Sequence, residues 1–381
     1  CLKQLSAQQL RLELSEIEDS SSQPPDDIQL PDVQLPLALR VKQLQLGALY
    51  LNDAPLLSAL QLVAELDGSQ LQLDELKLEL QGYQLGLSGQ LQMQADWPLE
   101  LTLEATGDLP DLGPQQVHLE LGGALQQRIQ LQAALAGVVQ GQLQGQAVPL
   151  LAALPATLEL NLDALQLAGV LPEGLAINGL QLKAEGDMAT GFAWQLQIPL
   201  AAQQHPFVLR GKGQAGLESA LIEQLTLSDA EHGQLTLQAT ANWQAELQAS
   251  AQIQANHFAW HWLAGMEQAP VALRDAQVSL DYADASWRGQ LQAALSGPAG
   301  DFELASRFQG DAEQAVLEPV LLTAGSGRVQ GRVQAGWAEE PTWQAQLEID
   351  ALDPAYWAAD WPGQLAGQLR STGRLGAMLE L

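Results

Sequence analysis

Apolar and polar residues alternate strictly along much of this chain. In residues 91–105 every odd-numbered residue is apolar, and the residues between them are mostly Gln, Asp, Glu or Thr. The same odd phase holds throughout residues 235–253. Successive side chains of a β-strand point to opposite faces, so this period of two predicts strands with one apolar face and one polar face.

The alternation also predicts how the strands connect. Residues 235–253 exceed a typical strand of about 5 or 6 residues, so either a two-residue turn near Asn242 preserves the phase or one strand bends through it. Turn-forming pairs such as Asp67-Gly68 and Gly186-Asp187 separate the alternating runs. Their short spacing predicts antiparallel hairpins.

Helical signals are scarce. Residues 256–266 are one short candidate. Residues 354–359 are another, with Asp353 as a plausible N-cap and Pro354 at the first helical position. Each could plug or cap the end of a sheet, but neither could form a layer over a large one.

A sheet with one apolar face must cover that face, because exposing it costs roughly 25 cal/mol for each Å². The chain lacks covering helices, so a sandwich, a barrel, a β-helix or a trough remains. The irregular period disfavours a β-helix, and missing aromatic girdles disfavour a membrane barrel. We therefore predict an all-β fold: an elongated, mostly antiparallel sheet folded into a hydrophobic trough, with one or two short helices.

The apolar face is the candidate functional site. A uniform wall of Leu and Ala suits acyl chains, which need only to escape water, but a Leu-rich core that faces itself fits the same pattern. Under the first interpretation, charged residues at Leu101 and Leu237 would block lipid passage. The predicted groove-lining residues are Leu91, Leu99, Leu101, Leu103, Leu158, Leu160, Leu162, Leu235, Leu237, Leu247 and Ile253.

Composition excludes some classes of function. The formal net charge of -29 argues against nucleic acid as a partner, because phosphate recognition needs a basic surface. The single cysteine, Cys1, allows no internal disulfide, and it is either a lipoprotein start or a fragment boundary, which we favour. The longest apolar run, residues 147–156, contains two prolines and is too short to cross a bilayer.

Three segments are expected along the chain. Residues 1–19 read as the end of a preceding strand segment, and residues 20–27 as a polar Ser/Pro/Asp linker. Residues 28–381 read as one continuous β-groove repeat region, truncated at both ends.

Motifs that could carry chemistry are weak. Residues 211–216 match a dinucleotide-binding glycine pattern, but residues 217–224 are too short for the helix that a βαβ unit needs. We interpret these glycines as turn and strand positions. His257 and His261 have metal-ligand spacing, yet no third ligand is evident, and a pair of side chains around Trp260 is the better interpretation. We expect no catalytic, cofactor or metal residues, and hence no enzyme.

Several segments together resemble a known family. They are residues 321–337, 343–350, 352–354 and 360–365, with similar patterns at 85–91 and 95–99. Their order along one chain resembles the TamB family of the translocation and assembly module, within the AsmA-like group. The resemblance covers most of residues 28–381.

The resemblance implies an elongated trough, termed a β-taco, in the periplasm of Gram-negative bacteria. It further implies an inner-membrane anchor at the N-terminus of the full protein and contact with the outer-membrane barrel TamA through its C-terminal region. This piece would then be the middle of the bridge. The implied role is phospholipid passage to the outer membrane, supporting outer-membrane biogenesis, and the family pattern includes no catalytic residues.

Two other functions stay open. One is a scaffold for assembly or insertion of outer-membrane barrels and autotransporters with TamA, in which sheet edges pair with client strands. The other is a β-helical adhesin or carbohydrate-processing enzyme, which requires exposed aromatic side chains beside paired carboxylates.

Overall fold

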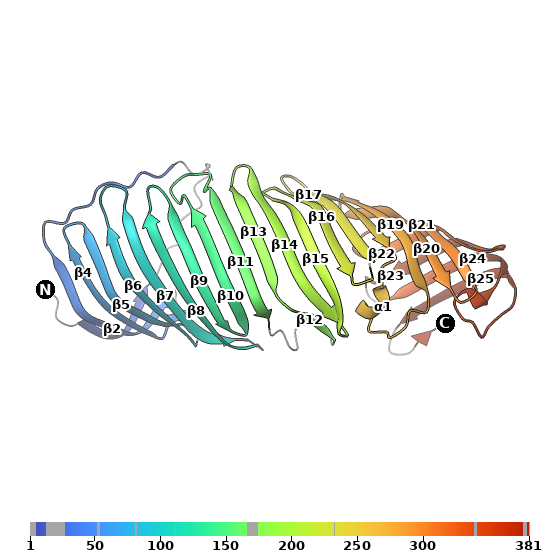
Figure 1. The fold of residues 1–381 in the computed structure, drawn as a ribbon, viewed down its shortest axis with the longest axis horizontal. Helices are drawn as coiled ribbons and strands as arrows, with labels where there is room; N and C mark the ends of the chain where they lie inside the picture. Colours follow the sequence, from blue (N-terminus) through green and yellow to red (C-terminus); the bar gives the residue numbers. More distant parts are fainter. Residues whose placement is uncertain are drawn as a thin grey trace. The chain divides into compact units, whose positions relative to one another are not determined.

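The computed structural model shows an almost wholly β chain. It describes residues 5–12, 27–51, 54–80, 82–110, 112–165, 174–231, 233–338, 341–375 and 379–380. These residues form 26 strands and two single-turn helices, which confirms the predicted all-β class (Figure 1). The chain divides into two compact units: residues 1–173 with 177–193, and residues 174–176 with 194–381.

The first unit is a sheet whose strands pair with their neighbours in the chain. All its printed pairings are antiparallel except that of the first two strands, which are parallel. The strands are β1 (Leu5–Leu12), β2 (Leu39–Leu51), β3 (Ala54–Leu57), β4 (Ala59–Asp67), β5 (Gln70–Leu80), β6 (Tyr83–Gln92), β7 (Pro98–Leu109), β8 (Gly113–Ala124), β9 (Ile129–Gly137), β10 (Val139–Ala147), β11 (Ala156–Leu165) and β13 (Leu180–Asp187).

The second unit repeats this antiparallel design. β12 (Leu175–Ile177) and β14 (Gly191–Ala202) each contribute residues to both units. The remaining strands are β15 (His205–Ala215), β16 (Ser219–Asp229), β17 (Gln234–Asn242), β18 (Gln248–Asn256), β19 (Ala272–Ala283), β20 (Ser286–Gly297), β21 (Gly300–Gly310), β22 (Gln314–Ala324), β23 (Gly327–Gly336), β24 (Thr342–Leu352), β25 (Leu365–Leu375) and β26 (Leu379–Glu380).

The long alternating run at residues 235–253 is a hairpin. β17 and β18 are joined by residues 243–247, so the turn is longer than the two residues we considered. The Trp243 indole Nε1 donates a hydrogen bond to the Leu217 carbonyl over 2.7 Å and ties this turn to the one before β16. Leu237 lies opposite Ile253, so the turn keeps both apolar runs on one face.

Both predicted helices form, and both are short. α1 (Trp260–Leu263) is shorter than the predicted residues 256–266. η1 (Pro354–Tyr356) is a single 3₁₀ turn. The Asp353 side chain accepts a hydrogen bond from the Ala355 backbone N–H, which confirms the predicted N-cap.

The two units bury apolar side chains very differently. In the described part of the first unit, the fully buried apolar residues are Leu99, Ala133 and Val138. In the second unit, buried residues gather into two clusters. One contains Ala202, Phe207, Ala255 and Phe258, and the other contains Phe302, Ala324, Val329 and Leu352. The first sheet therefore has no second layer over it among these residues, whereas the second is partly covered.

An extended segment, residues 27–35, lies across one edge of the first unit, and we call it the rim strap (Figure 1, along the upper edge). Its backbone N–H groups at Leu35, Val33 and Ile28 donate to carbonyls in three turns at this edge, those of Gly68, Met93 and Leu150. The Asp32 and Asp27 carboxylates accept further hydrogen bonds from the Ala95 and Ala152 N–H groups, respectively. Asp27 closes the predicted linker, whose residues 20–26 lie outside the described residues.

We expect Phe207→Ala to destabilise the second unit strongly. Phe207 is 1% exposed and its ring centroid lies 6.0 Å from that of Phe258. Removing such a side chain costs about 3–5 kcal/mol, which native-state hydrogen exchange of the β15–β17 amides would measure. Trp361→Ala, at a residue 71% exposed, should change this by less than about 0.5 kcal/mol. Equal effects of the two substitutions would contradict the assigned core.

Candidate functional site

The apolar face of the first unit is built from rows of residues that cross the sheet. Because paired residues share a face, each strand places one apolar residue directly opposite the next. We call one such series the Leu103 row. Its members on β2, β4 to β11 and β13 are Leu44, Leu62, Leu76, Leu87, Leu103, Leu119, Ala133, Leu143, Leu160 and Leu182.

Three further rows run parallel to it and contain only apolar residues and glycine. The first is Leu46, Leu60, Leu78, Leu85, Ala105, Val117, Leu135, Gly141, Leu162 and Leu180. The second is Val41, Ala64, Leu73, Gly89, Leu101, Leu121, Leu131, Gly145, Leu158 and Ala184. The third is Leu39, Leu66, Leu71, Leu91, Leu99, Gly123, Ile129, Ala147, Ala156 and Gly186.

Irregularities in pairing keep these rows intact where the sequence phase changes. In β5 the apolar residues are odd-numbered up to Leu73 and even-numbered from Leu76. The pairing with β6 shifts between these two residues, so that Leu73 faces Gly89 and Leu76 faces Leu87. An extra residue in one strand turns the following side chains back to the same face. The extra residue thus keeps the leucines of β5 on one face of the sheet although the alternation changes phase between Leu73 and Leu76.

The rows are long on the scale of a lipid. The Leu103 row crosses ten strands. With neighbouring strands about 4.8 Å apart, its nine intervals span about 43 Å. The hydrocarbon core of a bilayer, which holds two layers of acyl chains, is about 30 Å thick. One row therefore offers more length than a single acyl chain occupies.

Most of the predicted lining residues are half-buried on this face. In the first unit these are Leu91, Leu101, Leu103, Leu160 and Leu162. Leu99 is buried, at 4% exposed, and Leu158 is 38% exposed. The leucines pack sideways against their row neighbours but no buried cluster covers them, so in the described first unit this face is not a core that faces itself.

The predicted residues of the second unit are divided. Leu235, Leu237 and Ile253 are half-buried and lie side by side on β17 and β18. Leu247 lies in the turn between these strands and is 47% exposed, so it is not part of a row. The lining residues predicted from the sequence also omit most members of the Leu103 row. The alternation around Leu119 and Leu143 is as regular as that around Leu101, so it would have indicated these residues equally well.

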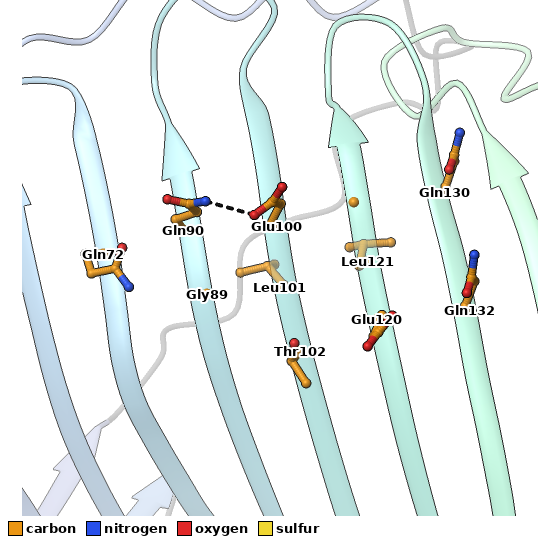
Figure 2. A pocket seen from close by; sticks show the side chains of 11 residues that line it. Gln72, Gly89, Gln90, Glu100, Leu101, Thr102, Glu120, Leu121, Gln130 and Gln132 are labelled. Atoms are coloured by element: carbon orange, nitrogen blue, oxygen red, sulfur yellow. Dashed lines mark hydrogen bonds between the residues drawn. The ribbon is translucent and has the colours of Figure 1, made fainter.

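The opposite face of the first unit is polar and carries a shallow hollow of about 540 Å³. Figure 2 shows side chains from β5 to β9 around it, with the Gln90 amide donating to the Glu100 carboxylate over 2.8 Å. Its polar lining is Gln72, Gln90, Glu100, Thr102, Glu120, Gln130 and Gln132. Gly122 also borders it, as do Gly89, Leu101 and Leu121, which belong to the apolar row that contains Leu101. Amides and exposed carboxylates make this face a solvated surface.

Ion pairs and hydrogen bonds join neighbouring strands on that polar face. Lys183 lies 3.3 Å from Glu159, on the paired strand β11. A hydrogen bond from the Asn161 side chain, and then the bond and charge of Lys183, lower the pKa of the Glu159 carboxyl. These contacts favour the charged form of the carboxylate, and a charged, exposed group suits a hydrated face.

The glycine motif is structural. Gly211 and Gly213 lie inside β15, not in a loop before a helix. A Cβ on Gly213 would come within 2.7 Å of the Trp194 ring, so glycine there makes room for the indole. This agrees with the interpretation of these glycines as strand positions.

The two candidate metal-ligand histidines have other partners. His257 Nδ1 lies 2.6 Å from the Asn256 side-chain oxygen, and the His261 ring packs 4.8 Å from that of Trp262. Across the described ranges, no group of three or more His, Cys, Asp or Glu side chains is placed to hold a metal ion.

Comparison with protein families decides the relationship. The family model described as TamB, N-terminal domain, matches residues 2–261 and again residues 260–378. The chain belongs to the TamB family. This confirms the resemblance read from the sequence. No solved structure matches the chain.

The TamB-family chain has only single-turn helices in its described ranges. None of them has the length or hydropathy that a membrane span requires.

We expect Leu103→Ala to cost little stability, about 1 kcal/mol, because Leu103 is half-buried and loses mainly its cross-strand contacts with Leu87 and Leu119. The matched control is Leu99→Ala in the same strand. Leu99 is buried, so its loss should cost about 2–5 kcal/mol. Hydrogen exchange of the β7 amides would measure both. A Leu103 cost as large as that of Leu99 would contradict an open face.

Proposed function

We propose that this chain is a non-enzymatic conduit for phospholipid in the periplasm, as part of a TamB-family protein that links the inner and outer membranes. Acyl chains lie along the apolar rows of the first unit. TamA in the outer membrane is the expected partner of the full protein. The observation that carries the proposal is the set of four apolar rows, which cross ten strands without a covering layer in the described residues.

The energetics favour a ligand with a long apolar part. Covering half-buried leucines gains roughly 25 cal/mol for each Å² removed from water. A ligand methylene placed on the rows contributes about 0.8 kcal/mol for the same reason. In the folded first unit the leucines of the rows stay half-buried, so part of this free energy is not gained on folding. An acyl chain that covers them gains the remainder.

The uniformity of the rows favours movement over tight, specific binding. Neighbouring members of the Leu103 row are all Leu or Ala, and no polar side chain interrupts them. A ligand that shifts by one strand meets nearly the same wall. Specific pockets instead hold a ligand with a few fixed polar groups.

A scaffold for outer-membrane β-barrel assembly is the second candidate. One observation favours it: β1 joins β2 as a parallel strand, with Leu5 opposite Leu44 and Leu12 opposite Leu51. An extended segment can therefore add to this sheet edge through backbone hydrogen bonds. The apolar rows have no evident role in such pairing, so we rank this function second.

Leu101→Asp tests the conduit. A carboxylate at this position, in the apolar row that runs from Val41 to Ala184, places a charge against an acyl chain. Because an unpaired buried charge costs several kcal/mol, we expect lipid captured by the intact protein to fall by about tenfold or more. The matched control is Thr102→Asp. Thr102 lies on the polar face of the same strand, and its change should leave lipid capture unaltered.

The readout is lipid extracted with the purified intact protein, quantified by mass spectrometry, with circular dichroism as the check of folding. Undiminished lipid in a folded Leu101→Asp protein would overturn the conduit. Co-purifying barrel polypeptide at the β1 edge, with no lipid in the parent protein, would favour the scaffold.

A further inference from the structure

The second unit carries two inserted segments that lie on its own apolar face. The α1 segment (residues 257–266) follows β18, and the η1 segment (residues 353–363) follows β24. Consecutive strands from β15 onward are antiparallel, so the turns after β16, β18, β20, β22 and β24 all lie at one edge of this sheet. Both segments therefore enter from the same edge.

The face beneath them is made of rows like those of the first unit. One row crosses from β15 to β25, and we call it the Leu235 row. Its members are Leu209, Leu227, Leu235, Ala255, Ala276, Ala293, Leu304, Leu322, Val329, Ile349 and Gly367.

The α1 segment packs onto the N-terminal part of this row. Phe258 is 4% exposed and joins Ala202, Phe207 and Ala255 in a buried cluster. Leu227, Leu235 and Ala276 of the row are among the residues packed against that cluster, together with Trp260 and Trp262. The aromatic side chains therefore occupy the surface that an acyl chain would cover.

The attachment of the α1 segment is light. The Asp229 carboxylate accepts a hydrogen bond from the Ala259 N–H over 3.2 Å, and the Trp260 indole donates to the Val271 carbonyl over 3.2 Å. The Trp262 and His205 ring centroids are 3.7 Å apart. No residue of the helix itself is buried, and Leu263 is 45% exposed. The His257 N–H also donates a hydrogen bond to the Arg274 carbonyl over 2.8 Å. The segment is therefore held by one buried side chain, Phe258, by the half-buried Trp260 and Trp262, and by a few polar contacts.

The η1 segment repeats this arrangement six strands later. The Asp353 carboxylate accepts hydrogen bonds from the Ala355 and Gly363 N–H groups. Tyr356 packs edge-on against Phe302, with ring centroids 6.3 Å apart. Leu322, Val329 and Ile349 of the Leu235 row belong to this second cluster. The first unit has no such buried cluster among its described residues.

We infer that the α1 segment is an internal competitor for acyl chains: it occupies the Leu235 row and must leave that row before lipid can lie there. The inference rests on the proposed lipid function. The segment and an acyl chain gain the same burial of Leu227 and Leu235, so their binding is mutually exclusive. A chain on the first unit meets no such competitor.

The test uses a photo-crosslinking residue at Leu209, on the Leu235 row outside the cluster, in the intact protein with Cys1→Ser. In one protein, Phe258→Ala and Trp262→Ala weaken the segment. In another, His205→Cys and Trp262→Cys allow oxidation to lock it down. A reporter at Leu103 reads the first unit independently, and Trp243→Ala, in a turn at the opposite edge, is the matched control.

We expect the weakened protein to crosslink phospholipid at Leu209 about fivefold more than the parent, the range of a typical coupling energy. The oxidised lock should crosslink less than its reduced form, and Trp243→Ala should match the parent. Because the lock retains Phe258, it remains informative if the weakened protein unfolds.

If lipid is still captured at Leu103, equal crosslinking at Leu209 in the oxidised and reduced forms of the His205→Cys, Trp262→Cys protein would overturn this inference and leave the proposed function standing. Absence of lipid at Leu103 in the parent protein would overturn the proposed function, and this inference with it.

Discussion

Backbone hydrogen bonding between neighbouring strands is the constraint on which the whole structure depends. Each strand must pair its N–H and C=O groups with the next, and paired residues then face the same side. An alternating sequence becomes a one-sided strand, and fixed register turns one-sided strands into continuous rows such as that of Leu103. A slip of one residue in any strand would move its leucines into the polar face. Register is thus as important for the proposed function as composition.

The two units use the same sheet in different ways. The first leaves its rows half-buried and ties one edge together with the rim strap. The second covers part of its rows with Phe258 and Tyr356, each carried on a segment inserted between two strands. The polar face is alike in both, with ion pairs such as Lys183 with Glu159 and Lys212 with Glu223. The apolar face is open in the first unit and partly covered in the second, which indicates that the access of a ligand to the rows differs between the two units.

Much of this could be predicted from the sequence because period-two alternation is a local signal. It located the strands, the apolar face and Leu101, and the Asp353-Pro354 pair marked the η1 turn. The rows could not be predicted, because register depends on turn lengths and bulges, such as the five-residue turn at 243–247 that leaves Leu247 exposed. The rim strap was also missed, because its bonds join Leu35 and Ile28 to turns far along the chain.

The central claim is that lipid lies on one face of a two-faced strand. Photo-crosslinking residues placed one at a time along β7 of the intact protein test it directly. The account predicts phospholipid adducts at Leu101, Leu103 and Ala105, and none at Glu100, Thr102 and Glu104, whose side chains point the other way. Adducts at both sets of positions, or adducts only to polypeptide at the first set, would contradict it.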